Sequence, residues 1–124
     1  MDPIAKGLLV FPLIGLIALQ HVGFLVLEMF LWQKPFGRKV FGLSEEDAKT
    51  TAVLAGNQGL YNGFLAAGLV YAFYVPSEMF TSVATFFLAC VLVAGIYGGF
   101  TASRKIWFVQ ALPALITLII LHIP

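Results

Sequence analysis

Four long apolar stretches, separated by shorter polar segments, dominate the hydrophobic pattern of this chain. A helix rises about 1.5 Å per residue, so about 20 apolar residues cross the hydrocarbon core of a bilayer. By this measure the predicted spans are residues 8–32, 51–75, 79–101 and 106–123. The pattern predicts an all-α polytopic membrane protein, a four-transmembrane-helix bundle in which residues 1–124 form a single domain.

The longest polar segment is the loop at residues 33–50, between the first two predicted spans. In this loop Ser44 is followed by Glu45, Glu46 and Asp47. A serine ahead of several acids is typical of a helix N-cap with a negatively charged first turn. We therefore expect the second helix to begin near Ser44, ahead of its apolar part.

Composition supports the membrane assignment. Hydrophobic residues make up 60% of the chain and charged residues 10%, more apolar surface than a soluble core of this size can bury. The formal net charge is only +1, whereas nucleic-acid-binding proteins are typically strongly basic. The expected partner is the lipid bilayer, and no nucleic-acid partner is expected.

Basic residues are distributed unevenly about the predicted spans. They are Lys34, Arg38, Lys39 and Lys49 in the loop at 33–50, Arg104 and Lys105 in the connection at 102–105, and Lys6 on the opposite side. Lysine and arginine near span ends favour the cytoplasm. We therefore expect a multi-pass protein of the cell membrane, with both of these loops cytoplasmic and both termini outside.

Polar side chains fall inside the predicted spans. Glu28 is the only acidic residue there, and His21, seven positions earlier, points to the same side of the helix about 10 Å deeper. On the antiparallel second helix, Asn57 and Gln58 are expected near the depth of Glu28, and Asn62 near that of His21. An ionisable group within a span marks a functional site by default.

These positions suggest one polar pocket, open to the cytoplasm, to which four helices contribute. The candidate ligand- or proton-binding residues are Glu28, His21, Asn57, Gln58, Asn62, Tyr61, Gln110 and Arg104. A carboxyl and an imidazole on one face could relay a proton, act as acid and base on a ligand, or neutralise a cationic guest. The structural alternatives are that Glu28 snorkels to the interface or pairs with Arg104, while His21 and the amides only connect helices.

Small residues recur every four positions in two of the spans. They are Ala55, Gly59, Gly63 and Ala67 in the second span, and Gly95 and Gly99 in the third. Such stripes let another helix approach closely. The neighbour is either a helix of the same chain or, in a homodimer, a helix of a second copy.

No metal site and no cofactor are predicted. His21 has no second His or Cys ligand at a useful spacing. The chain also has no phosphate loop, no serine-nucleophile motif and no haem-attachment pattern.

Three blocks of sequence carry a family resemblance. They are His21 with residues 27–32 (LEMFLW), residues 35–43 from PFG to VFGL, and residues 57–68 (NQGLYNGFLAAG). Together they resemble the small integral membrane proteins catalogued as domain of unknown function 1304. The resemblance implies a four-helix membrane protein and brings no established activity with it.

The favoured hypothesis is an integral membrane protein whose intramembrane polar pocket binds or transports a small molecule or protons. One alternative is an intramembrane enzyme of the isomerase type, in which Glu28 and His21 act as acid and base on a lipophilic substrate. The other is a structural or accessory membrane subunit, in which the polar groups hold helices together. The sequence leaves open whether the protein is an enzyme.

Overall fold

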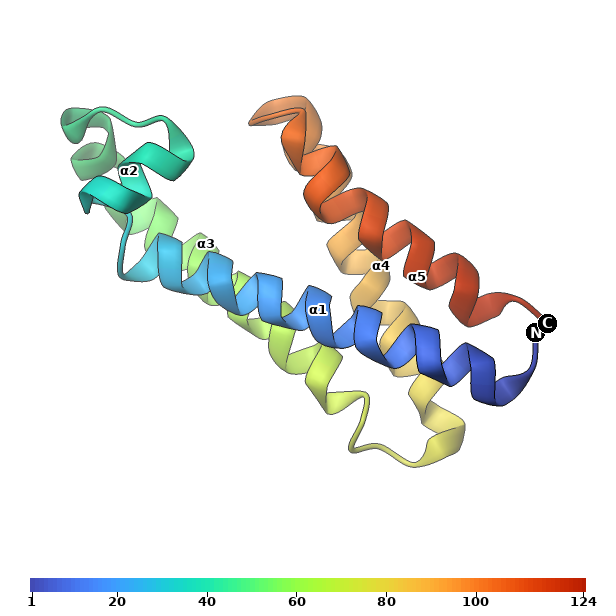
Figure 1. Ribbon diagram of the computed structural model, residues 1–124. Helices are drawn as coiled ribbons and strands as arrows, with labels where there is room; N and C mark the ends of the chain where they lie inside the picture. Colours follow the sequence, from blue (N-terminus) through green and yellow to red (C-terminus); the bar gives the residue numbers. More distant parts are fainter. The chain divides into compact units, whose positions relative to one another are not determined.

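The computed structural model describes residues 1–124 and contains helices without any strand, which confirms the all-α prediction (Figure 1). The elements are α1 (Pro3–Met29), α2 (Pro35–Phe41), α3 (Glu45–Tyr71), α4 (Ser77–Thr101), the π-helical turn η1 (Trp107–Ala111) and α5 (Leu112–His122). By length and composition, α1 and α4 could cross a membrane. The apolar segment Trp107–His122 is shorter.

The chain divides into two compact units, which we describe separately. Unit 1 comprises Met1–Ala18 and Ala67–Pro124, and unit 2 comprises Leu19–Ala66. Both boundaries fall inside long helices, so α1 and α3 each contribute to both units.

In unit 2, the second part of α1 lies beside α3, and small residues of α3 permit a close approach. A Cβ atom built on Gly59 would stand 3.2 Å from the backbone oxygen of Leu25. At Gly63 a Cβ atom would stand 2.5 Å from Leu25 Cδ1. These two glycines therefore contact a helix of the same chain, and a homodimer through the glycine stripes stays a prediction.

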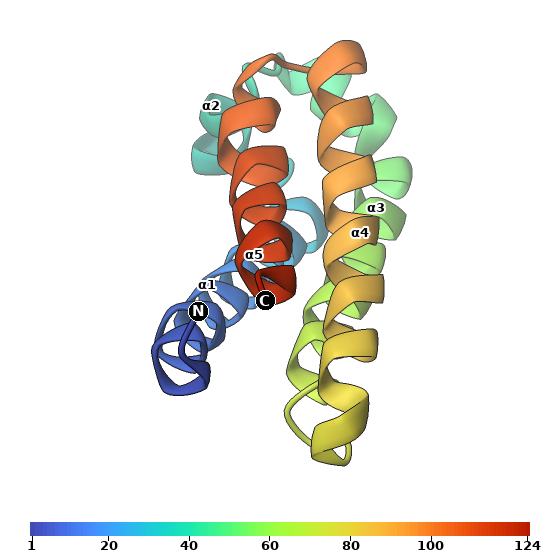
Figure 2. The same ribbon diagram turned by 90° about the vertical axis from the view of Figure 1, so that its right-hand side faces the viewer.

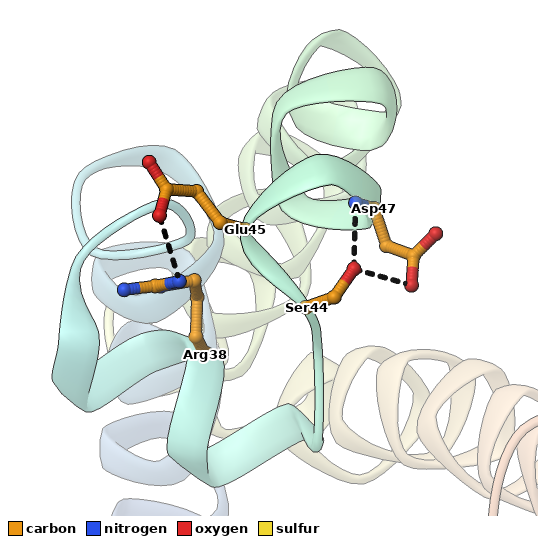
Figure 3. A network of polar contacts seen from close by, with 4 residues as sticks. All are labelled: Arg38, Ser44, Glu45 and Asp47. Carbon is orange, nitrogen blue, oxygen red and sulfur yellow. Dashed lines mark hydrogen bonds and ion pairs between the residues drawn. The ribbon is translucent and has the colours of Figure 1, made fainter.

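The start of α3 confirms the predicted N-cap (Figure 3). Ser44 Oγ accepts a hydrogen bond from the Asp47 backbone N–H at 3.0 Å and donates one to the Asp47 carboxylate at 2.7 Å. The helix begins at Glu45, one residue later. An ion pair of 3.6 Å between Arg38 Nη1 and Glu45 Oε2 connects α2 to this first turn.

The segment predicted as a loop at 33–50 contains a short helix, α2, which the sequence pattern did not predict. Pro35 is at the start of this helix, where a missing N–H removes no helical hydrogen bond. Gly42 ends it with φ 67°, the left-handed conformation that glycine adopts most readily, and donates its N–H to Arg38 O. A helix of 7 residues is too short for its apolar period to stand out.

In unit 1, α4 runs antiparallel to η1 and α5 (Figure 2). Their shared core contains Leu88 and Val91 of α4 with Ala114 and Thr117 of α5, all buried. At Gly95 a Cβ atom would stand 2.7 Å from Ala111 N, so the two backbones approach each other closely there. This packing accounts for the small-residue spacing predicted in the third span.

The helix that follows α4 begins with a π-helical turn, which the sequence pattern did not predict. The N–H of Leu112 donates to Trp107 O, five residues earlier, which is the π-helical bond. Pro113 follows immediately and has no N–H to donate. The turn therefore widens the helix at the point where the proline would interrupt regular α-helical bonding.

Candidate functional site

Glu28, in the last turn of α1, is the centre of the most polar group of contacts in unit 2. Its side chain is buried, with 4% exposure. Gln58 Nε2 donates to Glu28 Oε1 at 2.9 Å, and Asn62 Nδ2 donates to Glu28 Oε2 at 2.9 Å. Gln58 and Asn62 are one helical turn apart on α3, so each amide reaches a different carboxyl oxygen. We call Glu28, Gln58 and Asn62 the Glu28 clamp.

Gly59 lies between the two amides of the clamp and explains how they come so near. A Cβ atom on this residue would stand 2.9 Å from Glu28 Cβ and 2.8 Å from Met29 Cγ. Any larger residue would push α1 away from α3 and lengthen both hydrogen bonds. The glycine is therefore part of the geometry of the clamp although it has no functional group.

Both partners of Glu28 in the clamp are uncharged. The ion pair in this part of the chain joins Arg38 to Glu45, and Glu28 takes no part in it. A buried carboxylate is costly unless its charge is compensated. The clamp supplies hydrogen bonds but no positive charge, which leaves compensation to a proton or to a cationic guest.

An open depression of about 290 Å³ lies beside Glu28. Its lining includes Glu28, Met29, Trp32, Gln33, Lys34 and Ala52, all residues of unit 2. Trp32 is held in place there, because its Nε1 donates to Thr51 Oγ1 at 3.0 Å and its ring lies 4.7 Å from that of Phe41. The depression is thus bordered by the end of α1, the segment that follows it and one turn of α3.

Two predicted site residues meet Glu28 as hydrogen-bond donors, and one of them corrects the depth assigned from the sequence. Asn62 was expected near the level of His21, but its amide reaches Glu28. His21 is fully buried, and its ring packs edge-on against Phe24 with centroids 5.4 Å apart. The side chains of Glu28 and Asn62 together thus cover a difference in depth that a count of residues treats as fixed.

Asn57 and Tyr61 do not join the clamp. The Asn57 amide donates to Val53 O of its own helix at 2.9 Å. Tyr61 is 58% exposed, and its ring lies 6.0 Å from that of Phe64. Both residues share α3 with Gln58 and Asn62 but occupy other faces of the helix.

Gln110 and Arg104 belong to unit 1. Gln110 Nε2 donates to Val91 O at 3.1 Å, which connects η1 to α4. Arg104 is exposed in the turn after α4. The convergence of four helices on one pocket stays a prediction for these two residues.

Sequence reasoning missed three residues that border the depression, namely Trp32, Gln33 and Lys34. Trp32 was interpreted as the last residue of the first span and as part of a family block, and Lys34 only as an orientation signal. Their position in the sequence could have identified them. Residues that directly follow a helix stay near its last turn, and Glu28 lies in the last turn of α1. Lys34 N–H donates to Leu31 O at 3.0 Å, which keeps this segment folded back on α1.

Comparisons with known proteins place these residues in a wider context. The family described as "Protein of unknown function (DUF1304)" matches residues 15–122, a range that includes all three sequence blocks, the clamp and the depression. A relative in Lactococcus lactis subsp. lactis, named "Uncharacterized protein YpaA", is 33% identical over 106 residues, which cover 84% of this chain and 88% of the relative. No solved structure matches the chain.

Proposed function

The chain belongs to the DUF1304 family of proteins of unknown function, and we propose that it is a four-span membrane protein that binds and transports protons or small cationic molecules at Glu28. The family membership confirms the resemblance drawn from the three sequence blocks. In this proposal α1, α3, α4 and η1–α5 are the spans of a cell-membrane protein. The basic loops at 33–50 and 102–105 are cytoplasmic, and both termini are outside.

The observation that carries the proposal is the Glu28 clamp. A buried carboxyl with two uncharged donors and no ionic partner needs a positive charge. A proton and a cationic guest would compete for this single carboxyl. Competition for one site gives exchange, which is the basis for coupling the movement of a guest to a proton gradient.

The adjoining depression supports a guest larger than a proton. It is open, polar residues line it, and its volume of about 290 Å³ is just below the range of about 300 to 1,000 Å³ found for small-molecule sites. The guest would therefore be a molecule of a few heavy atoms. Its cationic group would lie at Glu28.

Binding of radiolabelled tetraethylammonium to the purified protein tests this function. The wild type should bind the cation, and the affinity should fall as the pH is lowered, because protons compete for Glu28. Glu28→Gln keeps the shape of the side chain and removes its charge, so it should weaken binding at least about tenfold. Glu46→Gln, on an exposed residue of α3, is the matched control and should bind as the wild type does. Equal binding by wild type and Glu28→Gln would reject the proposal.

A structural role for the clamp is the second candidate, and the same hydrogen bonds favour it. Both carboxyl oxygens find donors within the chain, and Gly59 packs against Glu28, as expected of a polar connection between two helices. This candidate predicts no cation binding by either protein in the experiment above. It also predicts that Glu28→Leu unfolds the protein, whereas Glu28→Gln is tolerated.

A further inference from the structure

Two opposite charges border the same depression. Glu28, in the last turn of α1, and Lys34, in the segment that follows, both belong to its lining. Neither residue takes part in the ion pair of this region, which joins Arg38 to Glu45. One acidic and one basic residue therefore border the same small volume.

The backbone of Lys34 is fixed although its side chain is exposed. Its N–H donates to Leu31 O at 3.0 Å, and the residue is extended, with φ −78° and ψ 155°, directly before Pro35. The four-carbon stem of a lysine is flexible, so its ammonium can follow a guest over several ångströms. Glu28, in contrast, is held at both oxygens by the clamp. One charged group is thus rigid and the other adaptable.

From this arrangement we propose that the depression binds a small zwitterion, a molecule with an ammonium group and an acid group a few bonds apart. The inference rests on the proposed function, since it assigns the ammonium of the guest to Glu28. The acid group of the guest, a carboxylate or a phosphate, pairs with Lys34. Gln33 and Trp32 also belong to the lining, and aromatic faces attract ammonium groups.

Two sources supply this chemistry. One is a free zwitterion such as an amino acid or a betaine, and the other is the headgroup of a zwitterionic phospholipid. Both combine an ammonium with an acid group, and both are small enough for one end to enter a depression of 290 Å³. The binding site requires the pair of charges and not the acyl chains, so soluble probes represent both sources.

Direct binding of three labelled probes to the purified protein, each measured separately, distinguishes a cation site from a zwitterion site and one zwitterion source from the other. Choline is a cation without an acid group, glycine betaine is a zwitterion of similar size, and glycerophosphocholine is the soluble headgroup of a phospholipid. We expect the wild type to bind at least one zwitterion about fivefold more tightly than choline, the value of one exposed ion pair. The zwitterion with the lower Kd identifies the source.

Variants of the two charged groups complete the test. Lys34→Gln should weaken binding of the preferred zwitterion about fivefold and leave choline binding within about twofold of wild type. Lys39→Gln is the matched control, because Lys39 lies in α2 and outside the lining of the depression. It should change neither the binding of the zwitterion nor that of choline. Glu28→Gln should weaken binding of every probe.

The outcomes distinguish this inference from the function on which it rests. If choline binds through Glu28 as tightly as both zwitterions do, or if Lys34→Gln weakens all probes equally, the zwitterion inference is overturned while cation binding stands. If no probe binds to the wild type, the zwitterion inference and the binding of small cationic molecules are both overturned.

Discussion

Gly59 of α3 lies directly against Glu28 of α1: a Cβ atom built on Gly59 would stand 2.9 Å from Glu28 Cβ and 3.2 Å from Leu25 O. Such separations are shorter than ordinary contacts between these atoms. The side chain of Glu28 could adjust slightly, but Leu25 O belongs to the backbone of α1. The glycine therefore sets the distance between the two helices, and with it the reach of Gln58 and Asn62 to the carboxyl.

Replacing this glycine should loosen unit 2. Gly59→Ala is expected to lower the free energy of unfolding by about 1 to 3 kcal/mol, because an added methyl group overpacks the contact. The control is Gly56→Ala on the same helix, where a Cβ atom meets nothing within 4 Å. That variant should be as stable as the wild type or more stable by up to about 1 kcal/mol, since alanine has a higher helix propensity than glycine. Unfolding in detergent micelles measures both, and equal effects of the two variants would contradict the close approach.

The energetic coupling within the clamp can be measured by a double-mutant cycle. Asn62→Ala and Glu28→Ala should show a coupling free energy of about 1 kcal/mol, because each variant alone already breaks their hydrogen bond. Asn57→Ala is the matched control, as the Asn57 amide donates to Val53 O of its own helix. Its coupling with Glu28→Ala should be below about 0.5 kcal/mol. Similar coupling free energies for Asn57 and Asn62 would contradict a specific Asn62–Glu28 hydrogen bond, because removal of any amide from α3 would then have the same effect.

The pairing of Glu28 with α3 illustrates what the sequence can predict. Antiparallel helices of known rise fix relative depth, so Gln58 was expected opposite Glu28, and the structure places its amide there. Depth alone does not fix the face of the helix, which is why Asn57, adjacent in sequence, points elsewhere. Nor does it include side-chain reach, which brings Asn62 to Glu28.

Short elements were harder to predict than long ones. The acids after Ser44 indicated the start of α3 correctly, because capping depends on neighbouring residues alone. In α2, Pro35 at the start and Gly42 at the end were present in the sequence as signals of a helix. The apolar residues between them were too few to show a period. Pro113 indicated an interruption of the last helix, but a proline alone does not specify that a π-helical turn precedes it.

The cap of α3 yields a prediction of its own. Ser44→Ala removes the acceptor of the Asp47 N–H and should lower the free energy of unfolding by about 1 kcal/mol. The matched control is Ser77→Ala at the start of α4, where Ser77 Oγ donates to Glu78 and the N-cap residue Pro76 makes no side-chain cap bond. We expect that variant to change stability by less than about 0.5 kcal/mol. Chemical unfolding followed by circular dichroism measures the difference, and equal losses would contradict the capping role of Ser44.

The contact between Gly99 and Trp107 should report on the packing of unit 1. Trp107 Nε1 donates to Ile96 O at 3.1 Å, and its ring lies so close to Gly99 that a Cβ atom there would overlap the indole. Gly99→Ala should therefore displace the ring, break this hydrogen bond and destabilise the protein by about 1 to 3 kcal/mol.

Fluorescence detects this displacement directly. The chain has 2 tryptophans, so Trp32→Phe leaves Trp107 as the sole emitter. In that background Gly99→Ala should shift the emission maximum of Trp107, because the indole N–H loses its hydrogen bond to Ile96 O and the surroundings of the ring change. Gly15→Ala, in the part of α1 that belongs to unit 1, is the control, since a Cβ atom there meets nothing within 4 Å. An emission maximum that Gly99→Ala leaves unchanged would show that α4 and η1 can separate without moving Trp107, contrary to the packing described here.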